Sequence, residues 1–481
     1  MQRKKISSLS FISLLFWFKI CLAEEDKDSH YKILTIAPDH NQVAQPIHGF
    51  GGSIAFWGTN PSDEAMHYAF EELGTSILRV QGEVKKTGNG QHSSEVLKRA
   101  MTINPDLEVL LTFWQPRAPG LLEVSDWLDI VDWRGGQAYM LKPSMEDAWA
   151  KEIVRRTREH LDWGIKVTTL GVQNETNYSK LGGQTCIWDP LRLKTFIEGK
   201  LSPRLKNAGI TIKIAAPDLA YVGYQGSELT RFLPTVRSDQ VDVVAYHMYD
   251  SYRDGMDGNL SVLRENSRKI GQIRREEFPQ KEFWMTETTG AQWNNDVWHT
   301  YGWSSQLTEF DKAIMAAQYA HMSLADAQAN VFMWWGLIYS LAPERVKNPK
   351  VREKHRDEGL VLVNEQPGPT GRQELVERTK KFFMIKQYSG FITDGFRRIA
   401  VNSPAPLWVS AYFQESQKSG VLVLINPSAH AVSLDLDLPE GMQVHGAYQS
   451  DEALNCETVS FGSPLPGRAV RTVLYSLKQS E

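Results

Sequence analysis

The chain has 481 residues, of which 42% are hydrophobic and 23% are charged, a composition that is ordinary for a globular protein with a sizeable core. Its net charge of −4 gives no electrostatic basis for binding nucleic acid, which usually requires a basic surface. We therefore expect no nucleic-acid partner.

The first 23 residues have the pattern of a secretory signal peptide. A basic head at positions 3–5 precedes an apolar stretch, and Ala23 stands before two acidic residues. Lys19 interrupts the apolar stretch, which argues against a permanent membrane span, and a lipid on Cys21 is the weaker alternative. No later segment has the length to cross a bilayer. We expect cleavage after Ala23, a secreted or periplasmic protein, and no stable membrane span.

Eight apolar, β-branched runs follow between residues 48 and 337, with helical segments between them. Such near-continuous runs are typical of parallel strands that are buried on both faces. The runs lie at 48–57, 75–81, 107–114, 168–175, 211–218, 241–249, 281–289 and 329–337. They predict an α/β fold, a (β/α)₈ TIM barrel. A doubly wound open sheet is the alternative, but no glycine-rich phosphate-binding motif follows any run.

The clearest helix is predicted at 145–163, between the third and fourth runs. Ser144 and Asp147 have the spacing of a capping box at its start, and Gly164 stops it.

From about residue 395 the pattern changes to segments in which apolar and polar residues alternate, with Pro, Gly and Ser turns between them. This predicts an antiparallel β-sandwich side domain. The strand-like segment YKILTIAP near residue 31 precedes the barrel and could complete the same sandwich. The predicted organisation is an N-terminal strand at 31–47, a catalytic barrel at 48–385 and a β-sandwich at 386–481.

The cysteines indicate neither a disulfide framework nor a metal site. Cys186 and Cys456 fall in different predicted domains, so that a single pairing between them stays open. No Cys/His cluster has metal-ligand spacing. We expect no metal and no cofactor.

Two glutamates stand just where predicted strands end. Glu175 ends the run TTLGVQNE, and Glu287 lies near the end of KEFWMTET. In a barrel of this type the active site lies at the carboxyl ends of the strands. Retaining glycoside hydrolysis requires two carboxyl groups about 5 Å apart, one as proton donor and one as nucleophile. Asn174 could also hydrogen-bond a sugar hydroxyl beside the carbon that is attacked.

Other strand-end residues suit a neutral polyol ring better than phosphate transfer or redox chemistry. Each also has a structural interpretation: an arginine pairs with a carboxylate, and a histidine or tyrosine packs in the core. Trp334 and Trp335 should point to opposite sides, and we expect Trp335 to be the sugar platform. The candidate substrate-binding residues are Arg79, Trp114, Asn174, His247, Tyr249 and Trp335; Trp57 and Asp218 also stand at strand ends, without an assigned role.

Six segments together resemble glycoside hydrolase family 30. They are HGFGGS (48–53), GGQAYMLKPSMEDAWAKEI (135–153), GVQNET (171–176), AYHMY (245–249), WMTETTG (284–290) and KFFMIKQYSGFITDGFRRI (381–399). The resemblance implies a (β/α)₈ barrel with a β-sandwich built from both termini. It also implies a retaining mechanism in which Glu175 is the acid/base and Glu287 the nucleophile. The family's sugar-contacting shell is matched more loosely, by Asn174, Arg79, Tyr249 and Trp335.

The chain departs from the family pattern in two informative places. Thr176 stands where the family usually has proline after the acid/base. The segment WWGLIYSLAPER lacks the adjacent arginines of the glucuronoxylan-cleaving branch. Glucosylceramide-like, β-1,6-glucan, galactan, xyloside and fucoside substrates all stay open.

We therefore expect a secreted, cofactor-independent retaining β-glycosidase that acts on an oligosaccharide, a polysaccharide or a glycolipid. A non-catalytic carbohydrate-binding barrel is the alternative from another class; decayed enzymes typically lose one carboxylate, and this chain keeps both. A third hypothesis is a scaffold whose β-sandwich binds a polymer or a partner. The sequence does not select the sugar, the linkage, or endo over exo action.

Overall fold

The computed structural model describes residues 31–54, 61–82, 93–116, 126–179, 181, 185–250, 260–289, 307–343, 346–368 and 371–478. The predicted signal peptide at 1–23 and Trp57 lie outside these ranges. None of the helices in the described ranges combines the length and the apolar character that a membrane crossing needs.

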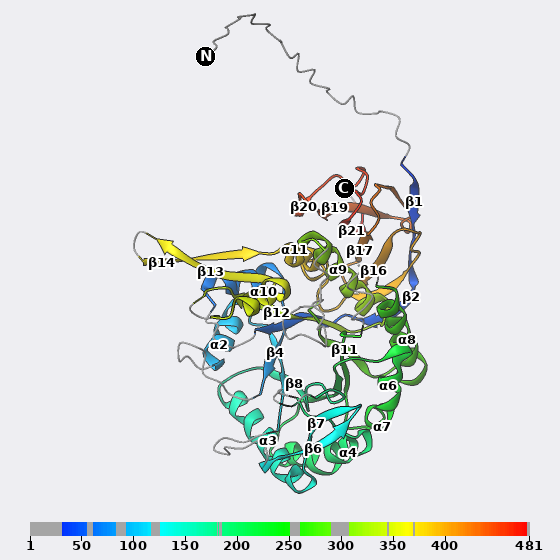
Figure 1. Ribbon diagram of the computed structural model, residues 1–481. Helices are drawn as coiled ribbons and strands as arrows, with labels where there is room; N and C mark the ends of the chain where they lie inside the picture. Colours follow the sequence, from blue (N-terminus) through cyan, green and yellow to red (C-terminus); the bar gives the residue numbers. More distant parts are fainter. Residues whose placement is uncertain are drawn as a thin grey trace, which may run out of the picture.

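Eight parallel strands close into a barrel, as the sequence predicted (Figure 1). Each strand pairs with its neighbours in chain order, and the last pairs with the first, which closes the ring. The strands are β3 (Gly49–Ile54), β4 (Ile77–Gln81), β5 (Glu108–Thr112), β8 (Val167–Gly171), β9 (Lys213–Leu219), β10 (Val243–His247), β11 (Glu282–Glu287) and β12 (Val331–Ser340). Each overlaps one of the predicted runs, but most are shorter, because the ends of the runs belong to the loops that follow.

Helices α1 to α9 lie in the connections between these strands, and α10 and α11 follow the last of them. They are α1 (Asp63–His67), α2 (Ser93–Ile103), α3 (Glu146–Asp162), α4 (Pro190–Phe196), α5 (Ser202–Asn207), α6 (Ser227–Arg231), α7 (Leu233–Val236), α8 (Ser261–Glu277), α9 (Glu309–His321), α10 (Pro349–Glu358) and α11 (Lys380–Ser389). Two hairpins extend from the barrel: β6 (Leu128–Trp133) with β7 (Gly136–Leu141), and β13 (Val361–Gly368) with β14 (Gly371–Arg378).

The predicted helix at 145–163 is present as α3, but the predicted capping box is wrong. A 3₁₀ turn at Pro143–Met145 leads into the helix, and the N-cap residue Met145 forms no side-chain cap. Proline at the first position of this turn costs no hydrogen bond, because the N–H that it lacks would have no partner there. Gly164 follows the helix with φ +79°, a conformation that favours glycine.

The inside of the barrel is filled by side chains from several of its strands. Ile77, Ala215, Trp284 and Met333 belong to one buried apolar cluster there, and Trp284 is only 1% exposed. This layer makes the barrel a packed core, not a pore. The space for a substrate is therefore restricted to the loops and strand ends.

A second, antiparallel sheet stands beside the barrel and takes strands from both sides of it in the sequence (Figure 1). Its order is β2 (Pro38–Pro46), β15 (Arg397–Val401), β16 (Trp408–Gln414), β17 (Ser419–Asn426), β21 (Ala469–Leu477), β19 (Met442–Ser450) and β20 (Asn455–Thr458). The small parallel pair β1 (Ile33–Ile36) and β18 (Ser433–Leu436) covers one face, where Leu34 and Ile36 share a core with Val409 and Leu424. The predicted barrel with a β-sandwich side domain is thus confirmed.

Helices α9 and α11 lie between the barrel and the side sheet, and one continuous apolar core spans the junction. Met315 of α9 and Phe382 of α11 share this core with Val423 of the side sheet. The two cysteines left open by the sequence are both free thiols, with Cys186 fully buried in the barrel and Cys456 in the side sheet.

Candidate active site

Glu175 and Glu287 meet at the carboxyl ends of the barrel strands. A carboxylate oxygen of each, together with a ring nitrogen of His247, forms a group whose atoms all lie within 4.8 Å of one another. The two carboxylate side chains are 14% and 10% exposed, so both can be reached from solvent. The structure thus brings two acids that are distant in sequence close together at one end of the barrel.

The backbone after β8 is held in an unusual conformation that presents Glu175. Strand β8 ends at Gly171, and the chain continues with Asn174 N–H donating to Phe113 O (2.7 Å) and Glu175 N–H donating to Asp218 O (2.9 Å). Glu175 has φ +55°, in the left-handed region that non-glycine residues rarely adopt. Such strain persists only where neighbouring hydrogen bonds enforce it, and it clusters at functional sites.

Two β-bulges place further polar side chains beside the glutamates. The register between β9 and β10 skips Asp218, which has φ +56°, and the register between β10 and β11 skips Thr286. The Thr286 hydroxyl donates to Asp218 Oδ1 over 2.5 Å. Bulges next to active sites commonly redirect a side chain in this way.

Arg79 of β4 is the centre of the hydrogen-bonded network. It is fully buried, and its guanidinium donates to Glu287 Oε2 (2.5 Å), to Asn174 Oδ1 (2.6 Å) and to Asp218 Oδ2 (2.9 Å). Removing one partner from such a buried network leaves an uncompensated charge and costs roughly 3–5 kcal/mol. Arg79 therefore fixes the positions of the Asn174 and Asp218 side chains, which lie next to Glu175.

His247 of β10 brings a second positive charge into this network. Its Nδ1 lies 3.5 Å from Glu175 Oε1, and its Nε2 lies 3.3 Å from Asp218 Oδ1. Burial alone would lower the pKa of His247, but the negative charges of Glu287 and Asp218 outweigh burial and raise this pKa to about 9. His247 is therefore an imidazolium at neutral pH.

The same charges act on the carboxyl groups in opposite directions. Burial would raise the pKa of Asp218, but attraction to Arg79 and His247 holds this pKa well below its usual range. For Glu175, burial is the largest influence and raises the pKa; the charge of Glu287 adds to this rise, and His247 opposes it. Asp218 is thus a permanent anion, whereas Glu175 is shifted toward its protonated form.

Glu287 receives its second hydrogen bond from Tyr249. The phenol donates to Glu287 Oε1 over 3.0 Å, while Arg79 holds the other oxygen. Burial, together with the charge of Glu287, raises the pKa of Tyr249 well above its usual value, so that the hydroxyl keeps its proton. The Glu287 side chain is thereby held in one rotamer by a hydrogen bond to each of its oxygens.

Two tryptophans form an aromatic wall beside the carboxylates. The rings of Trp114 and Trp335 lie 5.9 Å apart at 48°, and the Arg79 guanidinium lies 4.7 Å from the centre of the Trp114 ring. Each tryptophan is 7% exposed. Trp334 points the other way: it is fully buried in the main core, where its indole N–H donates to Glu358 O over 2.7 Å.

Glu175, His247 and Glu287 have the spacing of a metal site, but their chemistry does not suit one. With a pKa of about 9, His247 carries protons on both ring nitrogens at neutral pH and has no free lone pair for a metal. Arg79 and Tyr249 already occupy the Glu287 oxygens. The arrangement instead suits proton transfer and nucleophilic attack.

The structure brings all eight sequence-predicted site residues into this one region. Besides the two glutamates, five are connected to Glu175 or Glu287 directly or through Arg79, and Trp335 joins through its contact with Trp114. The sequence assigned no role to Asp218 and did not single out Thr286. The signal for Asp218 was its place at a strand end, but only the bulges reveal its contacts.

The fold and the site define a (β/α)₈ barrel with a side β-domain and paired carboxylates at the strand ends. The chain matches no protein-family model, and no curated protein sequence matches it. Among solved structures, it is similar to a GH30 endoxylanase from Clostridium papyrosolvens, with 19% identity and a TM-score of 0.64 over 92% of this chain and 100% of that one.

Two other solved structures have similar values. A conserved exported protein from Bacteroides fragilis has 16% identity and a TM-score of 0.69, over 92% of this chain and 100% of that one. An endo-β-1,6-glucanase has 17% identity and a TM-score of 0.65, over 92% of this chain and 94% of that one. The chain therefore has a fold like that of glycoside hydrolase family 30.

Proposed function

We propose that the protein is a retaining β-glycoside hydrolase in which Glu175 is the acid/base and Glu287 the nucleophile. The observation that carries this proposal is the approach of the two carboxyl groups to within 4.8 Å. Retaining enzymes place their carboxyl groups about 5–5.5 Å apart, whereas inverting enzymes need about 6.5–9.5 Å to admit a water molecule.

The surroundings of each glutamate support its role. In the first step, a Glu287 oxygen attacks the anomeric carbon, the bond to the leaving oxygen breaks, and Glu175 gives its proton to that oxygen. In the second step, Glu175 takes a proton from water, the water oxygen attacks the anomeric carbon, and Glu287 is released. The raised pKa of Glu175 suits it to give a proton first, and the contacts from Arg79 and Tyr249 hold Glu287 for in-line attack.

The proposed substrate is a β-linked glycan or glycoside. The Trp114–Trp335 wall offers flat apolar rings to the CH-rich face of a sugar, and the Asn174 amide lies one residue from the proposed acid. Structural similarity to a xylanase and a glucanase supports the same class. Secretion is proposed from the basic and apolar N-terminal segment, and one similar structure is described as an exported protein.

The test is a screen of aryl β-glycosides, β-1,6-glucan and xylan with the wild type, Glu287→Gln and Glu175→Gln. We expect Glu287→Gln to abolish turnover. Glu175→Gln should reduce kcat/KM by about 10²–10⁴-fold for poor leaving groups, and much less for dinitrophenyl glycosides, which need no proton. Glu440→Gln, an exposed glutamate of the side domain, is the matched control and should keep full activity.

The anomeric configuration of the first product separates the mechanisms. Proton NMR during turnover should show the β-anomer first. The retaining mechanism is wrong if the α-anomer appears first or if Glu287→Gln turns over every wild-type substrate. Sugar binding without turnover across the whole panel would favour the rival, a non-catalytic carbohydrate-binding barrel.

A further inference from the structure

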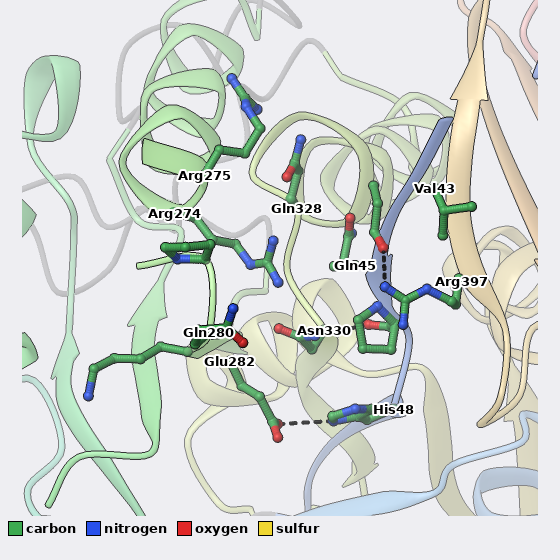
Figure 2. A pocket seen from close by; sticks show the side chains of 14 residues that line it. Val43, Gln45, His48, Arg274, Arg275, Gln280, Glu282, Gln328, Asn330 and Arg397 are labelled. Carbon is green, nitrogen blue, oxygen red and sulfur yellow. Dashed lines mark hydrogen bonds and ion pairs between the residues drawn. The ribbon is translucent and has the colours of Figure 1, made fainter. Parts of the chain in front are cut away.

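A cavity of about 560 Å³ lies at the other end of the barrel, where the strands begin. It is bounded by the end of α8, the start of β11, the segment before β12 and the side-sheet strands β2 and β15 (Figure 2). Glu282 at the cavity and Glu287 at the candidate active site are five residues apart on β11, or about 16 Å at roughly 3.3 Å per residue. The cavity is therefore separate from the candidate active site.

The lining of this cavity is strongly cationic. Its charged residues are Arg274, Arg275, Lys281, Arg397 and a single described carboxylate, Glu282. That carboxylate is already engaged, because it accepts from His48 (3.0 Å), Lys213 (2.6 Å) and the Trp284 indole (2.8 Å). The Lys281 ammonium donates its hydrogen bonds to backbone carbonyl oxygens. Three arginines are left without a carboxylate in the cavity to balance them.

Of the three arginines, Arg274 has the least usual surroundings for a charged side chain. It is only 8% exposed, and its Nε has no hydrogen-bond partner among the described residues. Figure 2 shows its head group turned into the space between Gln280 and Asn330. A buried charge without a counterion is costly, and burial together with Arg275 and Arg397 lowers the pKa of Arg274.

A purely structural role accounts for Arg274 less well. An arginine in the last turn of a helix can stabilise the helix dipole, and Arg274 and Arg275 both occupy the last turn of α8. Exposed Arg275 can serve this role from solvent. The dipole gives no reason to bury a second guanidinium and to direct it into a cavity, where an unpaired Nε remains.

We propose that this cavity binds a phosphate or sulfate group, whose oxygens accept hydrogen bonds from Arg274 and Arg397, with Arg275 at the rim. The planar guanidinium matches such oxyanions in bidentate geometry. Arg397 donates one N–H to Ala44 O (2.7 Å), and its guanidinium has further N–H groups to donate to an anion. The cavity lies within the roughly 300–1,000 Å³ of small-molecule sites and leaves room for a sugar attached to the oxyanion.

An anion bound here contacts the barrel and the side sheet together. Arg274 belongs to α8 of the barrel, and Arg397 to β15 of the side sheet. A ligand that binds only the folded protein raises its unfolding free energy by mass action. Phosphate or sulfate should therefore stabilise the junction.

The test is isothermal titration calorimetry of the full chain with inorganic phosphate, sulfate, glucose 6-phosphate and glucose, at constant ionic strength set by sodium chloride. We expect saturable binding of the three anions and none of glucose. Tighter binding of glucose 6-phosphate than of phosphate would identify a sugar ester as the source of the oxyanion; equal or weaker binding would identify the free ion.

Arg274→Met keeps the apolar stem and removes the charge, and it should weaken phosphate binding by about 10-fold or more. The control is Arg268→Gln, which removes an arginine from the same helix that pairs with Asp326 and does not line the cavity. It should bind phosphate like the wild type. Arg397→Gln is the second variant, in case circular dichroism shows that Arg274→Met does not fold.

Two results would overturn the proposal: no saturable heat with phosphate or sulfate, or equal phosphate affinity in the wild type and the folded variants. Glycoside turnover is measured separately, so failure of the catalytic proposal does not affect this test. Unliganded Arg274→Met should be at least as stable as the wild type, because it loses a buried charge without a counterion.

Discussion

Replacing His247 by glutamine should remove a defined pH dependence from the stability of the protein. The folded-state pKa of His247 is about 9, against 6.5 as its ordinary value. The folded state therefore holds this proton more tightly than the unfolded chain does. The resulting stability is complete below pH 6.5 and is lost as the pH rises through about 9.

The size of this effect follows from the shift. One pKa unit corresponds to about 1.4 kcal/mol, so a rise from 6.5 to about 9 contributes about 3 kcal/mol at low pH. His247 is fully buried between Asp218 and Glu287, so solvent screens this interaction little. We expect the unfolding free energy of the wild type, minus that of His247→Gln, to fall by about 3 kcal/mol between pH 6.5 and pH 9.

The assay is urea unfolding at half-unit pH steps, followed by circular dichroism and tryptophan fluorescence. His355→Gln is the matched control: burial lowers the pKa of His355 to about 4, so its contribution is present above pH 6.5 and lost as the pH falls through 4. Between pH 6.5 and pH 9, His355→Gln should therefore follow the wild type. Parallel curves for the wild type and His247→Gln in that window would refute the assigned charge of His247.

Two further predictions concern the active site and the barrel. Tyr249→Phe removes the hydrogen bond to Glu287 and should lower kcat/KM for an aryl glycoside by about 10- to 100-fold. An unchanged kcat/KM would show that Tyr249 does not contribute to turnover. Gly51→Ala would place a Cβ atom 1.8 Å from the carbonyl oxygen of Ile77 and should destabilise the fold by at least about 1–3 kcal/mol in urea unfolding. Gly199→Ala, in open space, is its control and should not reproduce this loss.

The barrel and its residues at the strand ends were predictable because buried parallel strands have a strong sequence signature. Near-continuous apolar runs locate the strands, and a polar residue at the end of such a run stands out. Glu175 and Glu287 were visible for this reason. The same reasoning separated Trp335 from Trp334, since neighbouring strand residues point to opposite sides.

Features that depend on backbone conformation were not predictable in this way. The left-handed conformation of Glu175 depends on hydrogen bonds to Phe113 and Asp218 from other strands, which no local pattern encodes. The bulge at Thr286 depends on register between strands. The false capping box had the right spacing, but a proline-led 3₁₀ turn begins α3 instead.

The pairing of β2 with β15 has a consequence for how the protein is made. Pro46 pairs with Arg397, so the partner is synthesised 351 residues later (397 − 46). At about 5–20 residues per second, translation takes roughly 20–70 s to cover this interval. During that time the backbone N–H and C=O groups on this edge of β2 have no strand partner, because β15 has not yet been synthesised. An unpaired strand edge is a template for pairing with other chains, and in β2 this edge is covered only after the whole barrel has been synthesised.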